Sequence, residues 1–147
     1  MRRVLVILGV LAVVGLAVAY FLLAPRSLPA SETASAHTPN LANGEVLFNA
    51  ANCSACHMTP GQDDRTHLAG GLKLKSPFGT FVTPNISPDP KAGIGAWTEA
   101  EFANAMKRGV GRRGEHLYPA FPYSSYALMT TNDVRDLFAY IKTLPAI

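Results

Sequence analysis

The sequence predicts an all-α fold, in which a few helices are joined by long irregular loops behind an N-terminal transmembrane helix. Three observations predict it. About 20 apolar residues without a charge follow the N-terminus. Two stretches in the last third of the chain repeat apolar residues at helical spacing. Beyond residue 40, aliphatic strand-forming residues are sparse while Gly and Pro are frequent, which favours loops between the helices.

The length and charge limit the classes of function. After a membrane segment is set aside, the 147 residues leave about one small domain with a modest core. The formal charge is +3, but Arg2 and Arg3 lie before the apolar segment and the remainder is nearly balanced. There is no long basic run with interleaved aromatic residues, so the sequence does not favour nucleic-acid binding.

Residues 4–24 form the apolar run, which is long enough to cross a bilayer as a helix. Arg2 and Arg3 precede it, which predicts that the N-terminus stays in the cytoplasm. The alternative is a cleaved signal peptide. One small-residue site, at residues 34–36, lies far from the apolar segment, and the other lies at residues 17–19. The apolar run continues past that site, so we expect residues 1–24 to be an uncleaved membrane anchor or uncleaved signal. In either case the rest of the chain is exported.

Residues 25–42 are rich in Pro, Ser, Thr and Ala and show no apolar periodicity. This composition predicts a flexible tether. His37 lies in this segment, and we expect a lone histidine there to be solvated.

The folded domain is predicted to span residues 43–147, with Asn43 as the N-cap of its first helix. Gly44 and Phe48 lie four residues apart, on one side of that helix. A glycine at this spacing permits close contact with another helix, beside which the aromatic ring packs. The apolar face leading onward consists of Val46, Leu47 and Ala50.

Residues 53–57 read Cys-Ser-Ala-Cys-His, the C-x-x-C-H pattern by which haem c is attached. Thiols three positions apart lie on one side of a helical turn, where Cys53 and Cys56 can add to the two vinyl groups of one haem. The next residue, His57, then directs its imidazole to the iron as the proximal ligand. The sequence therefore predicts one covalently bound haem c.

Three other readings of the same pattern are weaker. A disulfide between Cys53 and Cys56 would close a tight, strained loop and leave His57 unexplained. A thioredoxin-like redox pair needs a βαβ setting, which the sequence does not show. A zinc site needs two more ligands, and no second Cys or His pair has the spacing.

Two long loops are predicted, at residues 58–96 and 109–126. The first contains repeated Pro and Gly residues, and a haem would need one edge wrapped by irregular chain. Its apolar residues, which we expect to line that wall, are Leu68, Leu72, Leu74, Phe78 and Phe81. In the second loop we expect exposed polar residues at Arg112, Arg113, Glu115 and His116.

Two helices complete the domain. Thr98 and Glu101 form a capping box for the first, which runs to about residue 108 and stops at Gly109. Its apolar face consists of Phe102, Ala105 and Met106.

The closing helix has Thr131 as its expected N-cap and ends before Pro145. Its apolar residues fall at i, i+3, i+4 and i+7, namely Val134, Leu137, Phe138 and Ile141. We expect the first and last helices of the domain to cross near the haem.

These features resemble a known family. C-x-x-C-H after a short helix, with a closing aromatic helix, looks like the monohaem class I cytochrome c fold. Residues 43–147 also resemble the cytochrome c subunits of membrane-associated periplasmic dehydrogenases for alcohol, aldehyde or gluconate. The matching motifs are PFGT at 77–80, TPNISPD at 83–89, GIGAW at 93–97, HLYPAFPY at 116–123 and the run 133–145. Many relatives carry three such domains, whereas this chain has one C-x-x-C-H.

The resemblance implies an electron-transfer protein rather than an enzyme. Electrons would come from a partner dehydrogenase and leave toward a quinone or a terminal oxidase. We expect a single-pass protein of the bacterial cytoplasmic (inner) membrane, with its haem domain on the periplasmic side. The alternative is a haem enzyme or gas-binding sensor with an open sixth iron position, for which His67 or His116 would supply the distal group. A purely structural membrane subunit is a third reading.

Met129 is the predicted distal iron ligand, reached by elimination. Thioether sulfur is the usual partner of histidine in electron-carrying c haems. Met1 lies across the membrane, Met58 follows His57 too closely to reach the opposite face, and Met106 belongs to a helix core stripe. Met129 lies in a flexible stretch before the closing helix. Some relatives have methionine where this chain has Phe121, so the sixth ligand depends on this elimination; a histidine ligand, His116, and an open site remain alternatives.

Overall fold

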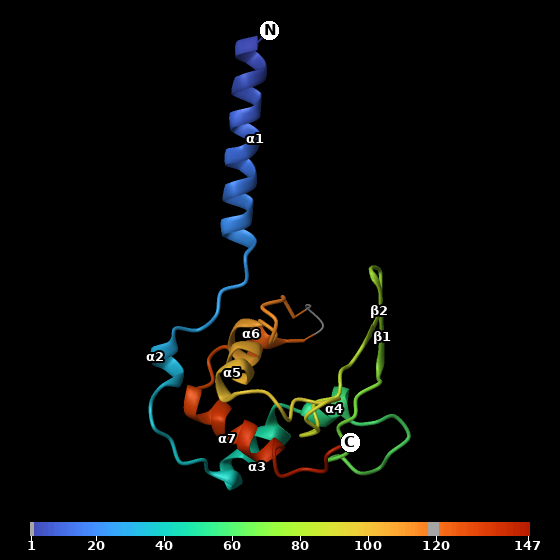
Figure 1. The fold of residues 1–147 in the computed structure, drawn as a ribbon. Helices are drawn as coiled ribbons and strands as arrows, with labels where there is room; N and C mark the ends of the chain where they lie inside the picture. Colours follow the sequence, from blue (N-terminus) through green and yellow to red (C-terminus); the bar gives the residue numbers. More distant parts are fainter. Residues whose placement is uncertain (1, 118–120) are drawn as a thin grey trace.

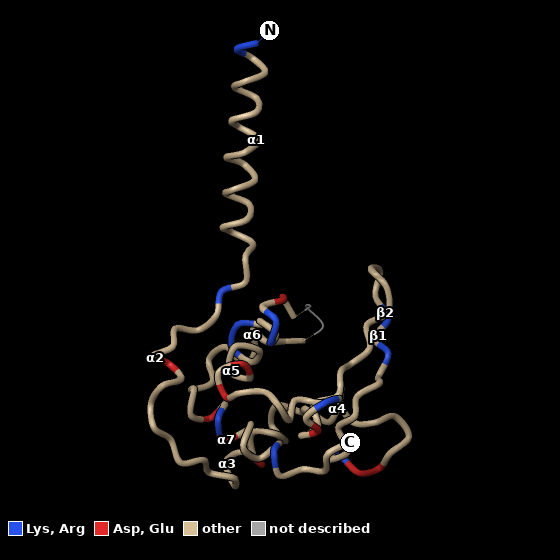
Figure 2. Tube along the Cα trace, in the orientation of Figure 1, with Lys and Arg blue, Asp and Glu red and all other residues tan. Residues whose placement is uncertain are grey.

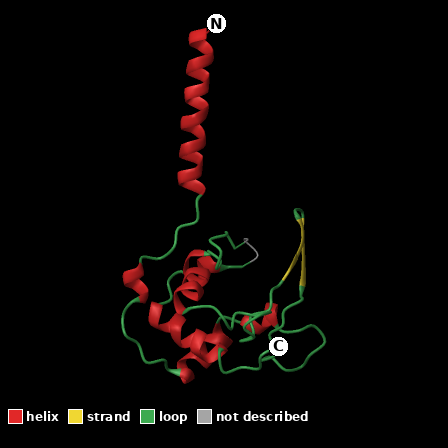
Figure 3. Cartoon of the chain, in the orientation of Figure 1, coloured by secondary structure: helices red, strands yellow, loops and turns green. Residues whose placement is uncertain are grey.

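The computed structural model of the chain describes residues 2–117 and 121–147. It is mostly helical, with one small two-stranded sheet (Figures 1 and 3). In chain order the elements are α1 (Arg2–Leu23), α2 (Ala30–Thr33), α3 (Leu41–Ala50), α4 (Cys53–His57), β1 (Lys73–Ser76), β2 (Gly79–Val82), α5 (Glu99–Arg108), α6 (Tyr123–Tyr126) and α7 (Thr131–Ile141). Met1, which entered the elimination above, and residues 118–120 of the predicted second loop and the HLYPAFPY motif lie outside the described residues.

The N-terminal apolar run forms α1, a helix of 22 residues with no buried residue. It projects away from the other elements (Figure 1). By length and composition it could cross a membrane, a property that it shares with N-terminal signal sequences. The predicted helix is therefore present.

The core lies where α3, α5 and α7 pack together. It contains Phe48, Leu68, Ile94, Phe102, Ala103, Met106, Val134, Leu137, Phe138 and Ile141. Gly44 and Phe48 are the buried residues of α3, and the Phe48 ring lies 5.5 Å from that of Tyr140 in α7. Phe102 of α5 stacks on Phe138 at 4.5 Å. The predicted crossing of the first and last domain helices is confirmed, with their contact at Gly44.

Gly44→Ala is expected to lower the free energy of unfolding by about 2 kcal/mol, because overpacking outweighs the higher helix propensity of alanine. A Cβ atom there would lie 2.7 Å from Cβ of Tyr140 and would also meet the backbone oxygen of Asp136. Denaturant unfolding of the detergent-solubilised full chain measures the change. Val46→Ala is the control, because Val46 is 65% exposed on the same helix. An unchanged stability for Gly44→Ala would show that the helices separate easily.

The caps were predicted with mixed success. α5 has the capping box between Thr98 and Glu101 and ends at Gly109, whose φ is 62°, as expected. The N-cap of α3 is Asn40, not Asn43, because the Asn40 side chain accepts a hydrogen bond from the Asn43 backbone N–H. Likewise α7 is capped by Thr130, not Thr131. In both cases the true cap lies upstream, in extended backbone geometry.

The strands add a small sheet to a chain that is otherwise mostly helical, as predicted, and they correct the prediction that residues 58–96 form an irregular loop throughout. β1 and β2 pair antiparallel, with Lys73 opposite Val82 and Leu74 opposite Phe81. Because alternate residues share a face, Lys73 and Lys75 lie on one face of this hairpin and Leu74 and Phe81 on the other. Of the apolar residues expected to line a haem wall, Leu68 is fully buried, whereas Phe78 is 82% exposed in the turn.

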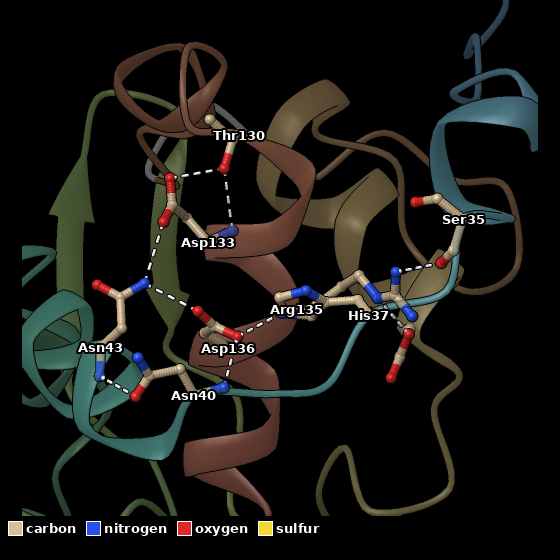
Figure 4. A network of polar contacts seen from close by, with 9 residues as sticks. Ser35, His37, Asn40, Asn43, Thr130, Asp133, Arg135 and Asp136 are labelled. Carbon is tan, nitrogen blue, oxygen red and sulfur yellow. Dashed lines mark hydrogen bonds and ion pairs between the residues drawn. The ribbon is translucent and has the colours of Figure 1, made fainter.

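The segment before α3 is bonded to the helical domain. The backbone N–H of Leu28 donates to Oδ1 of Asn104 at 2.7 Å. Further along, Arg135 of α7 donates to the backbone oxygen of Ser35 at 2.7 Å, and Nε2 of His37 lies 2.6 Å from Oδ1 of Asp136 (Figure 4). His37 is therefore half-buried and paired rather than solvated. We call these contacts of residues 28–40 with α5 and α7 the clasp. The division at residues 24 and 42 stays a prediction.

Candidate haem site

The Cys-x-x-Cys-His motif forms its own short helix, α4. Asn52 precedes it with a φ of 54°, a left-handed conformation that asparagine tolerates better than most residues and that ends α3. Ser54, inside the turn, is buried and donates a hydrogen bond to the backbone oxygen of Arg65 at 2.8 Å. Cys53 and Cys56, three positions apart on this turn, are half-buried free thiols. They are not joined in a disulfide.

The imidazole of His57 is oriented by the backbone. Its Nδ1 lies 2.9 Å from the backbone oxygen of Pro84, so Nδ1–H donates to that carbonyl and Nε2 is the nitrogen left for a metal. The backbone N–H of Gly70 donates to the oxygen of His57 at 2.8 Å. Burial lowers the pKa of His57, and the hydrogen bond to Pro84 offsets part of that effect. The imidazole is therefore neutral near pH 7, the form that coordinates iron.

The protonation of Cys53 bears on the competing readings. Burial, followed by the proximity of Cys56, raises the pKa of the Cys53 thiol to about 11, despite an opposing backbone hydrogen bond. Redox-active cysteines have a lowered thiol pKa. Among residues 2–117 and 121–147, no three His, Cys, Asp or Glu side chains gather as a metal centre. The donor set thus fits a haem c, with two thiols on one helical turn and a histidine whose Nδ1 is held by a backbone carbonyl.

The match to known families agrees with this donor set. The family model described as "Cytochrome c" matches residues 41–145. The chain belongs to the cytochrome c family.

This cytochrome c is similar to the cytochrome subunits of several dehydrogenases. It is 46% identical over 110 residues to the "Diheme cytochrome c-type" of Cereibacter sphaeroides, covering 74% of this chain and 37% of that protein. It is 44% identical over 119 residues to the "Fructose dehydrogenase cytochrome subunit" of Gluconobacter japonicus, covering 80% and 24%. With the "Alcohol dehydrogenase (quinone), cytochrome c subunit" of Gluconacetobacter polyoxogenes, identity is 42% over 125 residues, covering 84% and 25%. The chain spans about a quarter to a little over a third of the length of these relatives.

The structure shows where each residue considered as a distal iron ligand lies, and the choice of Met129 stays a prediction. Met129 is half-buried between α6 and α7, packs against the core cluster, and accepts a hydrogen bond from Nζ of Lys107 on its backbone oxygen at 2.9 Å. Met106 is buried in the core. Nε2 of His116 lies 2.6 Å from the backbone oxygen of Leu23, and Met58 forms the C-cap of α4. His116 also lines a cavity of about 370 Å³ with residues 117 and 121–124.

Three residues near the site were not predicted from the sequence. Pro84 and Gly70 act through their backbones, so no side-chain pattern could have shown their roles, although Pro84 lies in the TPNISPD motif. Tyr126 of α6 donates from its hydroxyl to the backbone oxygen of Ala51 at 3.0 Å, which joins α6 to the end of α3. Burial, followed by repulsion from Cys53 and Cys56 as thiolates, raises the pKa of Tyr126, so its hydroxyl stays protonated.

Proposed function

We propose that this chain is a one-haem, membrane-anchored periplasmic cytochrome that carries single electrons from a dehydrogenase toward a quinone or terminal oxidase. The α4 turn carries the proposal, because it presents two thiols and an imidazole whose Nδ1 is held by Pro84. The relatives support the dehydrogenase partner, since they are named as cytochrome subunits of fructose and alcohol dehydrogenases. A bound haem c would supply one-electron chemistry without making or breaking a substrate bond.

Each residue has a distinct part in this proposal. Cys53 and Cys56 hold the cofactor covalently, so it is retained outside the cell. His57 is the proximal ligand, and the carbonyl of Pro84 fixes its tautomer and ring orientation. Met129 is the distal ligand, and thioether ligation raises the potential and closes the iron to small molecules.

The haem count tests the central part of the proposal. After acid–acetone extraction of the denatured protein, we expect the colour to stay with the polypeptide, whose mass exceeds the apoprotein by one haem. A redox titration of the same sample should show a single one-electron wave. Loss of colour on extraction, or a second haem equivalent, would contradict the proposed haem attachment or its stoichiometry.

The anchor is tested separately. α1 is uncharged after Arg2 and Arg3, and under the positive-inside rule this supports a cytoplasmic N-terminus with the haem domain in the periplasm. We expect the natural protein to stay in the membrane on alkaline extraction and to retain residues 1–24. A chain beginning near Pro25 behind a cleavable signal should be a soluble red protein. A natural N-terminus near Tyr20 or His37 would show instead that α1 is a cleaved signal.

A further inference from the structure

The clasp leaves little free chain between α1 and the helical domain. α1 ends at Leu23, whose backbone oxygen lies 2.6 Å from Nε2 of His116, and Leu28 is already bonded to Asn104 of α5. Residues 24–27 are all that separate these two contacts, and four residues span at most about 14 Å. The domain is therefore held directly against the end of α1.

The clasp contains two buried charged side chains, those of Arg135 and Asp136, which are shielded from solvent. Arg135 is 8% exposed and pairs with Glu99 of α5 at 2.6 Å while it also binds the backbone of Ser35. Asp136 is 4% exposed; burial acts to raise its pKa, but hydrogen bonds from Asn43, Asn40 and His37 hold that pKa below its ordinary value. The carboxylate of Asp136 is therefore ionised near pH 7. Figure 4 shows its contacts with His37 and Asn40 of the 28–40 segment.

The hairpin extends from the domain in the direction that α1 takes (Figure 1). Lys73 and Lys75 lie on one exposed face of β1, and the turn beyond them exposes Phe78 by 82%. Arg112 and Arg113 are exposed in the loop after α5, where Arg112 pairs with Glu101 and Arg113 lies 3.8 Å from Glu115. Figure 2 shows Lys and Arg both on the hairpin and around the α5–α6 region, on the side of the domain from which α1 extends.

We infer that this side of the domain rests on the bilayer, with the β1–β2 hairpin in contact with anionic lipid. The inference rests on the proposed anchor. We call Lys73, Lys75, Phe78, Arg112 and Arg113 the bilayer-facing surface. Lysines favour anionic headgroups, and an exposed apolar ring such as that of Phe78 can be buried at the boundary between headgroups and acyl chains. Continuity with α1 and the short 24–27 link place this surface next to the lipid from which α1 emerges.

Site-specific photo-crosslinking tests the contact. The full-length holoprotein carries p-benzoylphenylalanine in place of Phe78 and is reconstituted in vesicles of phosphatidylcholine with phosphatidylglycerol. On irradiation we expect the peptide containing position 78 to gain the mass of one phospholipid. The control places the same label at Val46, which is 65% exposed on α3, at the end of the domain far from α1 in Figure 1. The yield at position 78 should exceed the yield at position 46 by at least about fivefold, the factor expected for one favourable basic contact.

Charge variants test the electrostatic part. Lys73→Glu with Lys75→Glu should lower the crosslinking yield at position 78 by about fivefold or more, and vesicles of phosphatidylcholine alone should lower it as well. Lys91→Glu, which changes one exposed charge outside the bilayer-facing surface, should not. A label at Val82, 57% exposed on the face that carries the lysines, gives an independent reading if the variant at position 78 does not bind haem.

The outcomes separate this inference from the anchor. If alkaline extraction releases the protein, the proposed anchor is wrong. If the protein stays in the membrane but positions 78 and 82 react with lipid no more than position 46, the contact of the hairpin with lipid is wrong. Crosslinking of position 78 to a polypeptide rather than to lipid in native membranes would also overturn it, and would assign the hairpin to a protein partner.

Discussion

Replacing Met129 with alanine is expected to lower the reduction potential by on the order of 0.1 V or more, within the range that axial ligands control. Met129, the distal ligand predicted by elimination, is half-buried just before α7, and thioether sulfur favours the reduced iron. The variant should also lose the weak long-wavelength band of the ferric protein and bind carbon monoxide when reduced. Potentiometry and optical spectra of the purified holoprotein measure all three changes.

The matched control for this experiment is Met106→Leu. Met106 is 6% exposed in the core beside Phe102, so a substitution of similar volume should leave the spectrum and potential unchanged. If Met129→Ala keeps the wild-type spectrum while Met106→Leu or His116→Ala changes it, the distal assignment is wrong. Carbon monoxide binding by the unaltered protein would favour the alternative of an enzyme or sensor with an open sixth position.

Replacing Cys53 and Cys56 together with serine is expected to abolish covalent haem. The two thiols lie on one turn of α4, and each forms one thioether in the proposed site. Without a covalent cofactor the small core loses a large apolar partner, so we also expect little folded protein to accumulate. Haem stain after denaturing electrophoresis measures the first effect, and yield of soluble or membrane-bound chain measures the second.

Ala55→Ser provides the control for the cysteine pair. Ala55 is exposed between the two cysteines, so this variant keeps the C-x-x-C-H spacing and should retain a full haem equivalent. Each single serine variant keeps one possible thioether and should lie between the two extremes. Covalent haem in the double variant would show that another side chain holds it, and the assignment of Cys53 and Cys56 would have to be abandoned.

Local sequence signals predicted the helices well where the signal is itself local. The capping box of Thr98 and Glu101, the stop at Gly109 and the apolar spacing of α7 depend on residues within one or two turns, and the structure contains all three. The hairpin was missed because each strand has only four residues, and because Pro77 in the turn and Gly79 at the start of β2 are typical of loops. Propensity has little weight in strands so short.

Contacts across long sequence separations were not predictable. His37 lies 99 residues from Asp136, and neither residue type nor spacing indicates that the two meet. The Pro-, Ser- and Thr-rich composition of residues 25–42 predicts a flexible segment, whether or not a later helix binds it. The haem motif is the opposite case, because the chemistry requires Cys53, Cys56 and His57 in one short pattern. No comparable pattern marks the distal ligand, because the candidates are spread over separate segments. Met129 was therefore predicted by elimination.

The hydrogen bond from His57 to Pro84 has a consequence for how the site tolerates mutation. Its acceptor is a backbone carbonyl, so any side chain at position 84 that keeps the local path also keeps the acceptor. Gly70, which lies next to Pro84 in space, cannot be replaced in the same way. Gly70 has a φ of +71°, and a Cβ there would collide with the backbone oxygens of Thr83 and Pro84. The orientation of His57 thus depends on the absence of a side chain at Gly70. Substitutions at Gly70 are therefore expected to disturb the site more than substitutions at Pro84.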